Sequence, residues 1–364
     1  MKLSQITAAL EEVAPLSLQE SYDNSGLLIG SYSKEIYKAL ITLDVTEEVI
    51  DEAIQENCEL IIAHHPMIFT GIKKITGSNL TERLIIKAIK NDIAVYAIHT
   101  NLDNVAQGVN KKLAEKLGLE KLQILKAGKS ELKKLVTFCP LKHMEKVRTA
   151  MFEAGAGHIG NYSDCSFNTS GTGSFKALDG SDPFVGEQGK IHLEDEIRIE
   201  TIVPDYRMSK VLKAMNDAHP YEEVAYDIYP LRNSDPTTGA GMIGEIKQAE
   251  TATDFLKNVK KILGTPFLRH SPLIQQKVKK VAICGGSGSF LIDAAQGAGA
   301  DVFITGDIKY HDFFEHNNKM TIVDAGHFET EQFTKDLLYD ILKQKFPTFA
   351  LRISVTNTNP VTFL

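Results

Sequence analysis

Cysteine is scarce in this sequence, which has four in 364 residues. The four lie far apart and form no C-x-x-C pair, which argues against a thiolate metal site. We expect free and mostly buried thiols, as is usual in a reducing compartment. A metal bound by this chain must therefore use histidine and carboxylate ligands.

Positive charge and long hydrophobic runs are also in short supply. The net charge of -7 leaves no excess of Lys and Arg to neutralise phosphates, which argues against a general nucleic-acid or anionic-membrane binder. No apolar run approaches the roughly 18 residues that span a bilayer. The start, MKLSQITAALEEVAPL, lacks the basic region, apolar core and cleavage site of a signal peptide. We therefore expect a cytoplasmic protein with no membrane partner.

What the sequence does contain is an alternation of apolar strand-like runs and amphipathic helical runs. Strands that are apolar throughout, with helices between them, predict a mostly parallel sheet covered on both faces. The pattern resumes in the last third of the chain, so we predict one doubly wound α/β domain built from both chain ends. The expected strands are 37–44, 58–66, 93–100, 277–286, 300–307, 320–326 and 349–357, and the expected helices are 46–57, 80–92, 109–118, 290–299, 309–317 and 329–346.

A different unit interrupts this pattern between about residues 132 and 232. It contains two β-α-β units separated by a Gly- and Ser-rich stretch, 166–190, which we expect to form an exposed hairpin or loop. This order predicts a ferredoxin-like split β-α-β domain. The predicted boundaries are 1–127 with 238–364 for the discontinuous α/β domain, and 128–237 for an inserted α+β domain with a regulatory or oligomerisation role.

Polar side chains gather directly after the predicted strands. In open α/β sheets, ligands bind beyond the carboxyl ends of the strands, where loop residues need no packing role. We therefore expect the functional residues in these loops. The clusters are AHHP at 63–66, HTNLD at 99–103, TGD at 305–307 and DAGHFETE at 324–331.

His64 and His65 follow an apolar strand as neighbours. Adjacent side chains of an extended segment diverge, so each imidazole can reach a different ion, and Pro66 favours the extended geometry. A single histidine there would more often be a satisfied interior residue. Asp103 has two interpretations: a cap of the helix beginning near Gly108, or a carboxylate bridging two metals.

His327 and Glu331 are spaced i, i+4 at the start of the last predicted helix. This spacing places both side chains on one helix face, within reach of the same ions. The alternative is an ordinary acidic first turn that stabilises the helix dipole, which explains Glu329 better. The combination of three histidines and two carboxylates from three strand ends favours a site of mixed nitrogen and oxygen ligands.

Such ligands suit zinc, and also iron, manganese or cobalt, and they do not suit calcium. Five ligands leave two ions with open positions for water. Two carboxylates and a bridging hydroxide would leave the two divalent ions with a net charge of about +1, which favours an anionic substrate. His99 is a candidate acid/base group or a further ligand, and His311, in a cluster with Asp307 and Lys309, is a second candidate acid/base group. Gly285–Ser289 could cradle a phosphate, or form a tight turn with a serine cap.

The order AHHP, HTNLD, ITGD and DAGHFETE, with SYDNSGLLIG near the start, resembles the Ngg-interacting-factor-three-like family over essentially the whole chain. Members are widely labelled GTP cyclohydrolase 1 type 2 homologs. The resemblance implies two divalent metal ions per subunit on the five residues selected above, and ring-shaped homohexamers. It also implies an insert similar to small trimeric nitrogen-regulatory proteins, as in the long bacterial form. Tyr22 replaces the tryptophan of many members.

Two functions follow as expectations. The first is a metal-dependent hydrolase that attacks a nucleotide or related phosphorylated compound through metal-activated water, with His99 or His311 as the acid/base. The second is a non-enzymatic hexamer that stores, senses or is held together by metal. DNA binding has little support from the acidic composition.

Overall fold

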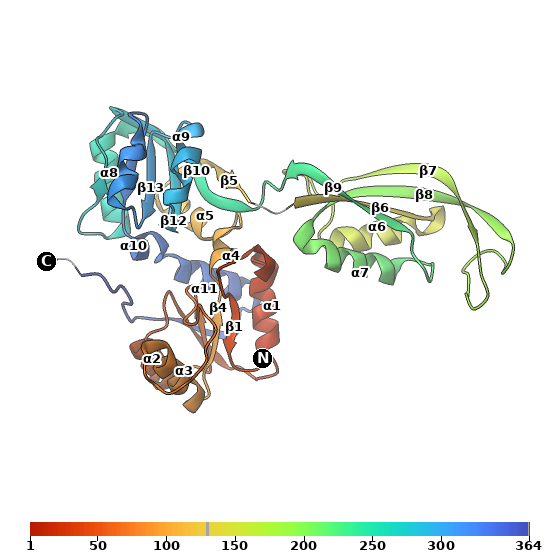
Figure 1. Ribbon diagram of the computed structural model, residues 1–364, viewed down its shortest axis with the longest axis horizontal. Coiled ribbons are helices and arrows are strands. Elements are labelled where there is room, and N and C mark those ends of the chain that lie inside the picture. The colour runs from red at the N-terminus through yellow and green to blue at the C-terminus, as the bar shows by residue number, and fades with distance from the viewer. Residues whose placement is uncertain (129–130, 363) are drawn as a thin grey trace. The chain divides into compact units, whose positions relative to one another are not determined.

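Three β-sheets organise the chain in the computed structural model, which describes residues 1–128, 131–362 and 364 (Figure 1). Two of the sheets belong to one compact unit made of residues 1–128 and 237–364. The third sheet belongs to a second unit, residues 129–236. None of the described helices is both long and apolar enough to cross a membrane.

The first sheet is mostly parallel and carries helices on both faces. Alternate side chains along its strands point to opposite faces, because successive residues of a strand do so. Ile62 and Tyr96 pack with the first and last helices of the chain, whereas Ile61 and Val95 pack under the two helices between the strands. Its strand order is β1 (Gly26–Ile29), β4 (Ala94–Ala97), β3 (Leu60–Ala63), β2 (Lys38–Thr42) and β15 (Ala350–Ile353), and its helices are α1 (Leu3–Val13), α2 (Glu47–Gln55), α3 (Leu80–Lys90) and α11 (Thr334–Lys345).

The second sheet has a parallel centre and antiparallel edges. β12, β13 and β14 run parallel; β10 pairs antiparallel with β12, β11 pairs antiparallel with β14, and β5 pairs antiparallel with β10. Apolar clusters fill both faces under the covering helices. Its order is β11 (Arg269–His270), β14 (Thr321–Asp324), β13 (Val302–Gly306), β12 (Lys277–Ser287), β10 (Gly239–Thr251) and β5 (Leu119–Ala127), and its helices are α5 (Val109–Lys116), α8 (Ala252–Leu263), α9 (Ile292–Gly297) and the 3₁₀ helix η5 (Tyr310–His316).

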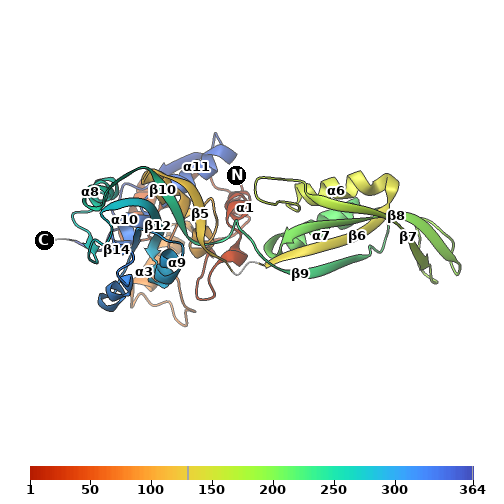
Figure 2. The same cartoon turned by 90° about the horizontal axis from the view of Figure 1, so that it is seen from above.

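The two chain ends form two sheets and not one, which corrects the single doubly wound sheet expected from the sequence. β5 leaves the first half of the chain to pair with β10 in the second sheet (Figures 1 and 2), while β15 returns from the far end to pair with β2 in the first. Apolar runs identify which residues form strands, but they do not specify which strands pair. The chain is thus a mixed α/β protein with several sheets.

The second unit has a four-stranded antiparallel sheet with two helices on one face (Figure 1). The Gly- and Ser-rich stretch forms the long strand β7 and the turn that follows it, as the hairpin expectation required. Its strand order is β7 (Ser166–Lys176), β8 (Ile191–Pro204), β6 (Glu131–Pro140) and β9 (Tyr226–Ser234), with helices α6 (Met144–Glu153) and α7 (Met208–Ala218).

Candidate metal centre

Two neighbouring histidines continue strand β3 beyond its last residue. The backbone N–H of His65 donates to the carbonyl of Leu43 at 2.9 Å, so the segment stays extended beside β2. Extended backbone turns successive side chains apart, and the ring centroids of His64 and His65 lie 4.9 Å from each other. Each imidazole therefore faces a different part of the same cluster of side chains.

The short helix α10 (His327–Glu331) supplies the other half of the cluster. Gly326 enters it with φ 91°, a conformation that favours glycine. The i, i+4 spacing then places His327 Nε2 3.1 Å from Glu331 Oε2. The helix lies close to β12 and β13, since a Cβ added at Gly286 would collide with the Glu331 carboxylate.

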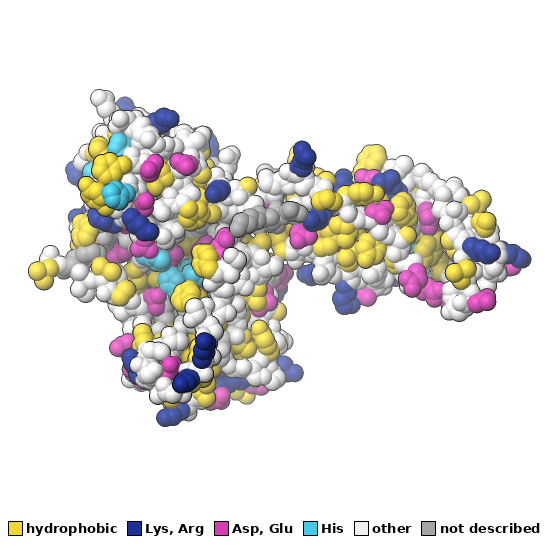
Figure 3. Space-filling view, in the orientation of Figure 1, with side chains coloured by type: hydrophobic (Ala, Val, Ile, Leu, Met, Phe, Trp, Pro, Cys, Tyr) yellow, Lys and Arg dark blue, Asp and Glu magenta, His cyan; other side chains and the backbone are white. Residues whose placement is uncertain are grey.

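These side chains converge, although they come from both ends of the sequence. His64 Nε2 lies 3.6 Å from Asp103 Oδ1 and 3.8 Å from Glu331 Oε1. His65 Nε2 lies 3.0 Å from Glu331 Oε2 and 3.3 Å from His327 Nε2. Histidine side chains are visible at the surface of this unit in Figure 3. Three overlapping groups have ligand atoms within 4.8 Å of one another: His64, His65 and His99; His65, His327 and Glu331; and His64, Asp103 and Glu331.

Every histidine of the cluster has its proton position fixed by an acceptor at Nδ1. A carbonyl or carboxylate oxygen accepts hydrogen bonds and has none to give, so Nδ1 must be the donor. Nε2 of each neutral ring then carries a lone pair and faces the other ligand atoms, as in metal-binding imidazoles. The pairs are His64 with Ile98 O at 2.8 Å, His65 with Asp44 at 2.7 Å, His99 with Asp23 at 2.7 Å and His327 with Asp307 at 2.6 Å.

Three buried polar atoms in the described part of the chain are left without a hydrogen-bond partner at the centre of this cluster. They are His64 Nε2, Asp103 Oδ1 and Glu331 Oε2. An unpaired buried polar atom costs roughly 1–3 kcal/mol, so three at one point require an explanation. Lone pairs of nitrogen and oxygen that converge without protons between them fit a divalent cation of the zinc, iron, manganese or cobalt kind.

The pKa values of the most buried residues are shifted by burial and by neighbouring charges. Burial, together with the charge of Glu331, raises the pKa of Asp103 well above its ordinary value. Burial would also raise the pKa of Glu331, but the imidazoles of His327 and His65, whose Nε2 atoms lie 3.1 Å and 3.0 Å from Oε2, outweigh it and hold that pKa well below normal. Burial lowers the pKa of His64, which keeps this imidazole neutral.

The other two imidazoles hold protons more tightly. Burial works against the charged form of His65, but its hydrogen bond to Asp44 and the nearby Glu331 carboxylate raise the pKa to about 10. The same balance, with Glu331 and Asp307 as partners, raises the pKa of His327 to about 9. Without a metal, protons on these nitrogens neutralise the carboxylates. A metal ion would therefore compete with protons for the same atoms.

The residues predicted from the sequence are not all in one place. His99 lies in the cluster, just before the short helix α4 (Thr100–Asp103). Asp103 ends that helix and does not cap the next one, whose N-cap is Gly108. His311 is exposed on η5, in ring contact with Tyr310 at 5.2 Å, and it belongs to none of the three ligand groups found among the described residues.

The first two backbone donors of the glycine-rich loop are not available to a phosphate. The backbone N–H of Gly285 donates to Asn110 Oδ1 at 2.9 Å, and that of Gly286 donates to Thr330 Oγ1 at 3.0 Å. Both donors are therefore already used within the chain. Gly286, with φ 61°, forms a tight turn beside Glu331, and no serine side chain caps the 3₁₀ helix η4 (Ser289–Leu291) that follows.

The sequence interpretation missed the carboxylates behind the histidines. Asp44, directly after β2, accepts from His65 and also from the hydroxyl of Thr358 at 2.7 Å, and Asp23 accepts from His99. Asp23 is part of SYDNSG, a motif that marked the family resemblance but gave no role for the carboxylate. For Asp44 the available signal was its place directly after β2, the strand that pairs with β3, which the two histidines follow.

Comparison with known proteins places this chain in a family. The sequence signature described as Duf34/NIF3 (NGG1p interacting factor 3) matches residues 1–360. The chain belongs to this family. Its Duf34/NIF3 relatives include long members that match from end to end, so the inserted unit is shared with them.

Two relatives bear the name GTP cyclohydrolase 1 type 2 homolog. The protein from Halalkalibacterium halodurans is 44% identical and covers 97% of this chain and 96% of its own length. The protein from Bacillus subtilis is 43% identical and covers 99% and 98%. The solved structure of a Bacillus cereus protein related to NIF3 is 42% identical, with a TM-score of 0.88 over 100% of this chain and 99% of that one.

Proposed function

We propose that the chain is a dinuclear metal-dependent hydrolase that acts on a nucleotide or a related phosphorylated compound. One observation carries the proposal: three buried, unpaired ligand atoms converge with the Nε2 atoms of two further histidines. A fold gains nothing from such an arrangement unless cations fill it. The family name of the relatives points in the same direction, towards a cyclohydrolase.

The ligand groups favour a division of the five side chains between two ions. Glu331 turns Oε1 towards His64 and Oε2 towards His65 and His327. His64 and Asp103 would hold one ion, and His65 and His327 the other. Glu331, and not Asp103, is then the carboxylate best placed to be shared. Zinc is the ion we favour, with iron, manganese or cobalt as alternatives.

Divalent ions in such a centre act as Lewis acids and lower the pKa of water at the site. The chain's own residues supply the remaining functions. His99 lies with its ring centroid 5.3 Å from that of His64 and 5.2 Å from that of His65, and Asp23 fixes its orientation. It is therefore the better-placed acid/base group, since His311 is exposed and lies outside the three ligand groups of the described residues.

The second unit is proposed to be the ferredoxin-like insert of the long family members. The proposal rests on its topology. The strand order is β7-β8-β6-β9, one helix lies between β6 and β7, and another lies between β8 and β9. We propose a regulatory or oligomerisation role for it, within a cytoplasmic homohexamer.

Turnover of a nucleotide library by metal-loaded protein tests the proposal. His65→Ala is expected to abolish turnover and to lower metal content, because it removes a ligand. Glu329 lies in α10 beside Glu331 but outside the ligand groups. Glu329→Gln is therefore the matched control and is expected to keep both turnover and metal content. Tight binding of metal with no turnover of any nucleotide would reject the hydrolase and leave a metal-binding protein.

A further inference from the structure

The second unit contains a pocket of about 700 Å³. Strand β7 forms much of its wall, with Phe138 from β6, Glu196 and Arg198 from β8 and the segment after α7. Phe138 pairs in register with Arg198, and their neighbours Cys139 and Ile197 pack in the core under the helices. The two pocket residues therefore lie on the sheet face that the helices leave open. The volume is that of a small-molecule site.

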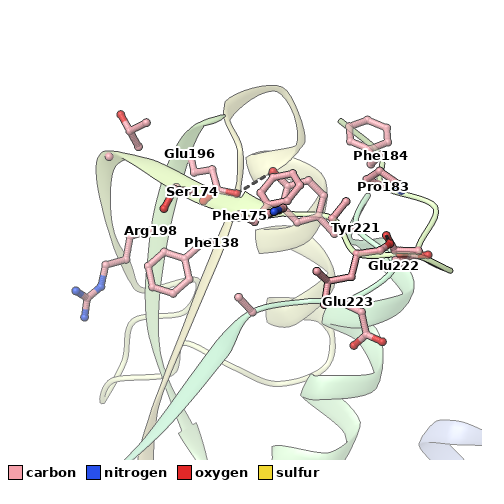
Figure 4. Close-up of a pocket in the computed structure, with 18 of the residues that line it drawn as sticks. Phe138, Ser174, Phe175, Pro183, Phe184, Glu196, Arg198, Tyr221, Glu222 and Glu223 are labelled. Atoms are coloured by element: carbon pink, nitrogen blue, oxygen red, sulfur yellow. Dashed lines mark hydrogen bonds between the residues drawn. The ribbon is translucent and has the colours of Figure 1, made fainter. Parts of the chain in front are cut away.

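Aromatic rings dominate the pocket wall (Figure 4). The ring of Tyr221 lies 6.2 Å from those of Phe175 and Phe184, measured between centroids, and Phe138 adds a further ring from the floor of the sheet. His219 supports Tyr221 from behind at 5.0 Å. Flat apolar surfaces of this kind select planar ligands, which stack on them or meet them edge to face.

One carboxylate is built into this aromatic wall. Glu196 Oε1 accepts a hydrogen bond of 2.8 Å from the Tyr221 hydroxyl. Burial, followed by the hydrogen bond to Glu196, raises the pKa of Tyr221, so its hydroxyl keeps the proton that it donates. Gly173 makes room for the second oxygen, because a Cβ at this position would collide with Glu196 Oε2. The glycine thus allows the carboxylate to lie against the backbone of β7.

The charge of the pocket is unbalanced towards acid. Three carboxylates line it, those of Glu196, Glu222 and Glu223, against the two cations of Lys176 and Arg198. The Arg198 guanidinium pairs with Glu200 at 2.9 Å, outside the lining residues, and it points away from the aromatic rings in Figure 4. The surplus of negative charge opposes a phosphate or a carboxylate and favours a cation.

We propose that this pocket binds a small planar aromatic or heteroaromatic compound that carries a cationic N–H donor, such as an amidine, guanidine or protonated ring amine. The ring stacks among Phe138, Phe175 and Tyr221, and the N–H group donates to Glu196. Such a ligand is opposite in charge to the phosphorylated substrate proposed for the metal centre. The insert would then sense a compound that the metal centre does not process.

Benzamidine and benzoate, which share a ring and differ in charge, are the probes for a test on the full-length protein. Titration calorimetry or ligand-observed NMR should show benzamidine binding at least about tenfold more tightly than benzoate, the difference expected for a charge-assisted hydrogen bond in a partly buried site. In Glu196→Gln, which keeps the acceptor for Tyr221, the ratio should fall towards one. Glu187→Gln, exposed and outside the pocket lining, should behave as wild type.

A second variant distinguishes a specific loss of benzamidine binding from unfolding of the protein. Gly173→Ala keeps every charge but displaces the Glu196 carboxylate, and it should weaken benzamidine binding several-fold with an unchanged circular dichroism spectrum. Equal binding of both probes, or an unaltered ratio in Glu196→Gln, would overturn the proposal. So would absence of benzamidine binding to the folded full-length protein.

Discussion

The two candidate sites of this chain use the same kinds of side chain in opposite ways. In the metal centre, His64 and Glu331 are buried with ligand atoms that have no hydrogen-bond partner. In the pocket of the inserted unit, Glu196 is only partly buried and is held by a tyrosine hydroxyl among aromatic rings. The first arrangement suits metal ions, whereas the second suits an organic cation with a flat apolar body.

The difference shows that the partners of a carboxylate, more than its identity, decide what it binds. Glu331 faces three imidazoles whose Nδ1 protons point outwards, so the lone pairs converge inwards. Glu196 faces a hydroxyl that keeps its proton, so one of its oxygens is satisfied and the other can accept an N–H. Four experiments would break or sharpen this contrast.

The largest effect is expected from Glu331→Gln. Glu331 belongs to two of the three ligand groups, one with His65 and His327 and one with His64 and Asp103. The change removes the charge of its carboxylate and keeps the side-chain volume, so we expect metal affinity to fall more than about 100-fold. Metal content after dialysis and calorimetric titration with zinc measure it. Glu329→Gln is the control in the same helix, and benzamidine binding to the insert should be unchanged in both variants. Retention of two ions by Glu331→Gln would contradict the assignment.

Removal of metal should destabilise one unit and spare the other. An ion at 1,000 times its dissociation constant contributes about 4 kcal/mol to the native state, because it binds only the folded site. Chelation should therefore speed amide hydrogen exchange in β3, β14 and α10. Exchange in β6 and β8 of the second unit serves as the internal control and should not change. Equal acceleration in both units would show that the ion is not confined to the first.

The pH dependence of the metal-free protein should reveal the protons that replace the ions. The pKa of His65 is raised to about 10 and that of His327 to about 9, from 6.5. Their stabilising contribution is therefore fully present below about pH 6.5 and is lost as the pH rises through 9 to 10. The pKa of His64 is lowered, so its protonation destabilises the fold only below pH 6.5 and has no effect between pH 6.5 and 10.

Urea denaturation of metal-free protein between pH 6.5 and 10 measures this loss. Metal affinity should change in the opposite direction and rise with pH, because binding releases the same protons. A metal-free stability that is flat, or that increases, across the window would contradict the proton positions described for the cluster.

The smallest effect is expected in the C-terminal segment. Thr358 donates to Asp44, which orients His65, so Thr358→Val should weaken metal binding by about tenfold or less. Thr356→Val is the matched control, because Thr356 donates to Glu52, which is outside the ligand groups. It should leave metal affinity unchanged and lower stability by about 1 kcal/mol. Equal metal affinities of the two variants would remove Asp44 as a positioning residue.

The sequence predicted local structure better than pairing. The runs that become β2, β3 and β4 are largely apolar, because both faces of their sheet are covered. β10 gave no such signal, since GAGMIGEIKQAET mixes small and charged residues, yet this strand joins β5 to β12. Without it, the division into two sheets could not be foreseen.

In the candidate site, too, the local features were predicted and the tertiary contacts were not. The pair His64–His65 and the pair His327–Glu331 each have a local spacing that indicates shared geometry, and the structure brings both pairs together. Asp44 and Thr358 are joined only by tertiary contact across 314 positions. No local pattern could connect them. The pocket around Glu196 was also invisible, because its aromatic residues come from separate strands and loops.

Anomalous diffraction at the zinc edge from metal-loaded crystals tests the central claim most directly. The account predicts two peaks per chain, one beside His64 and Asp103 and the other beside His65 and His327, with a Glu331 oxygen at each. A single peak elsewhere, or none within reach of these five side chains, would contradict it.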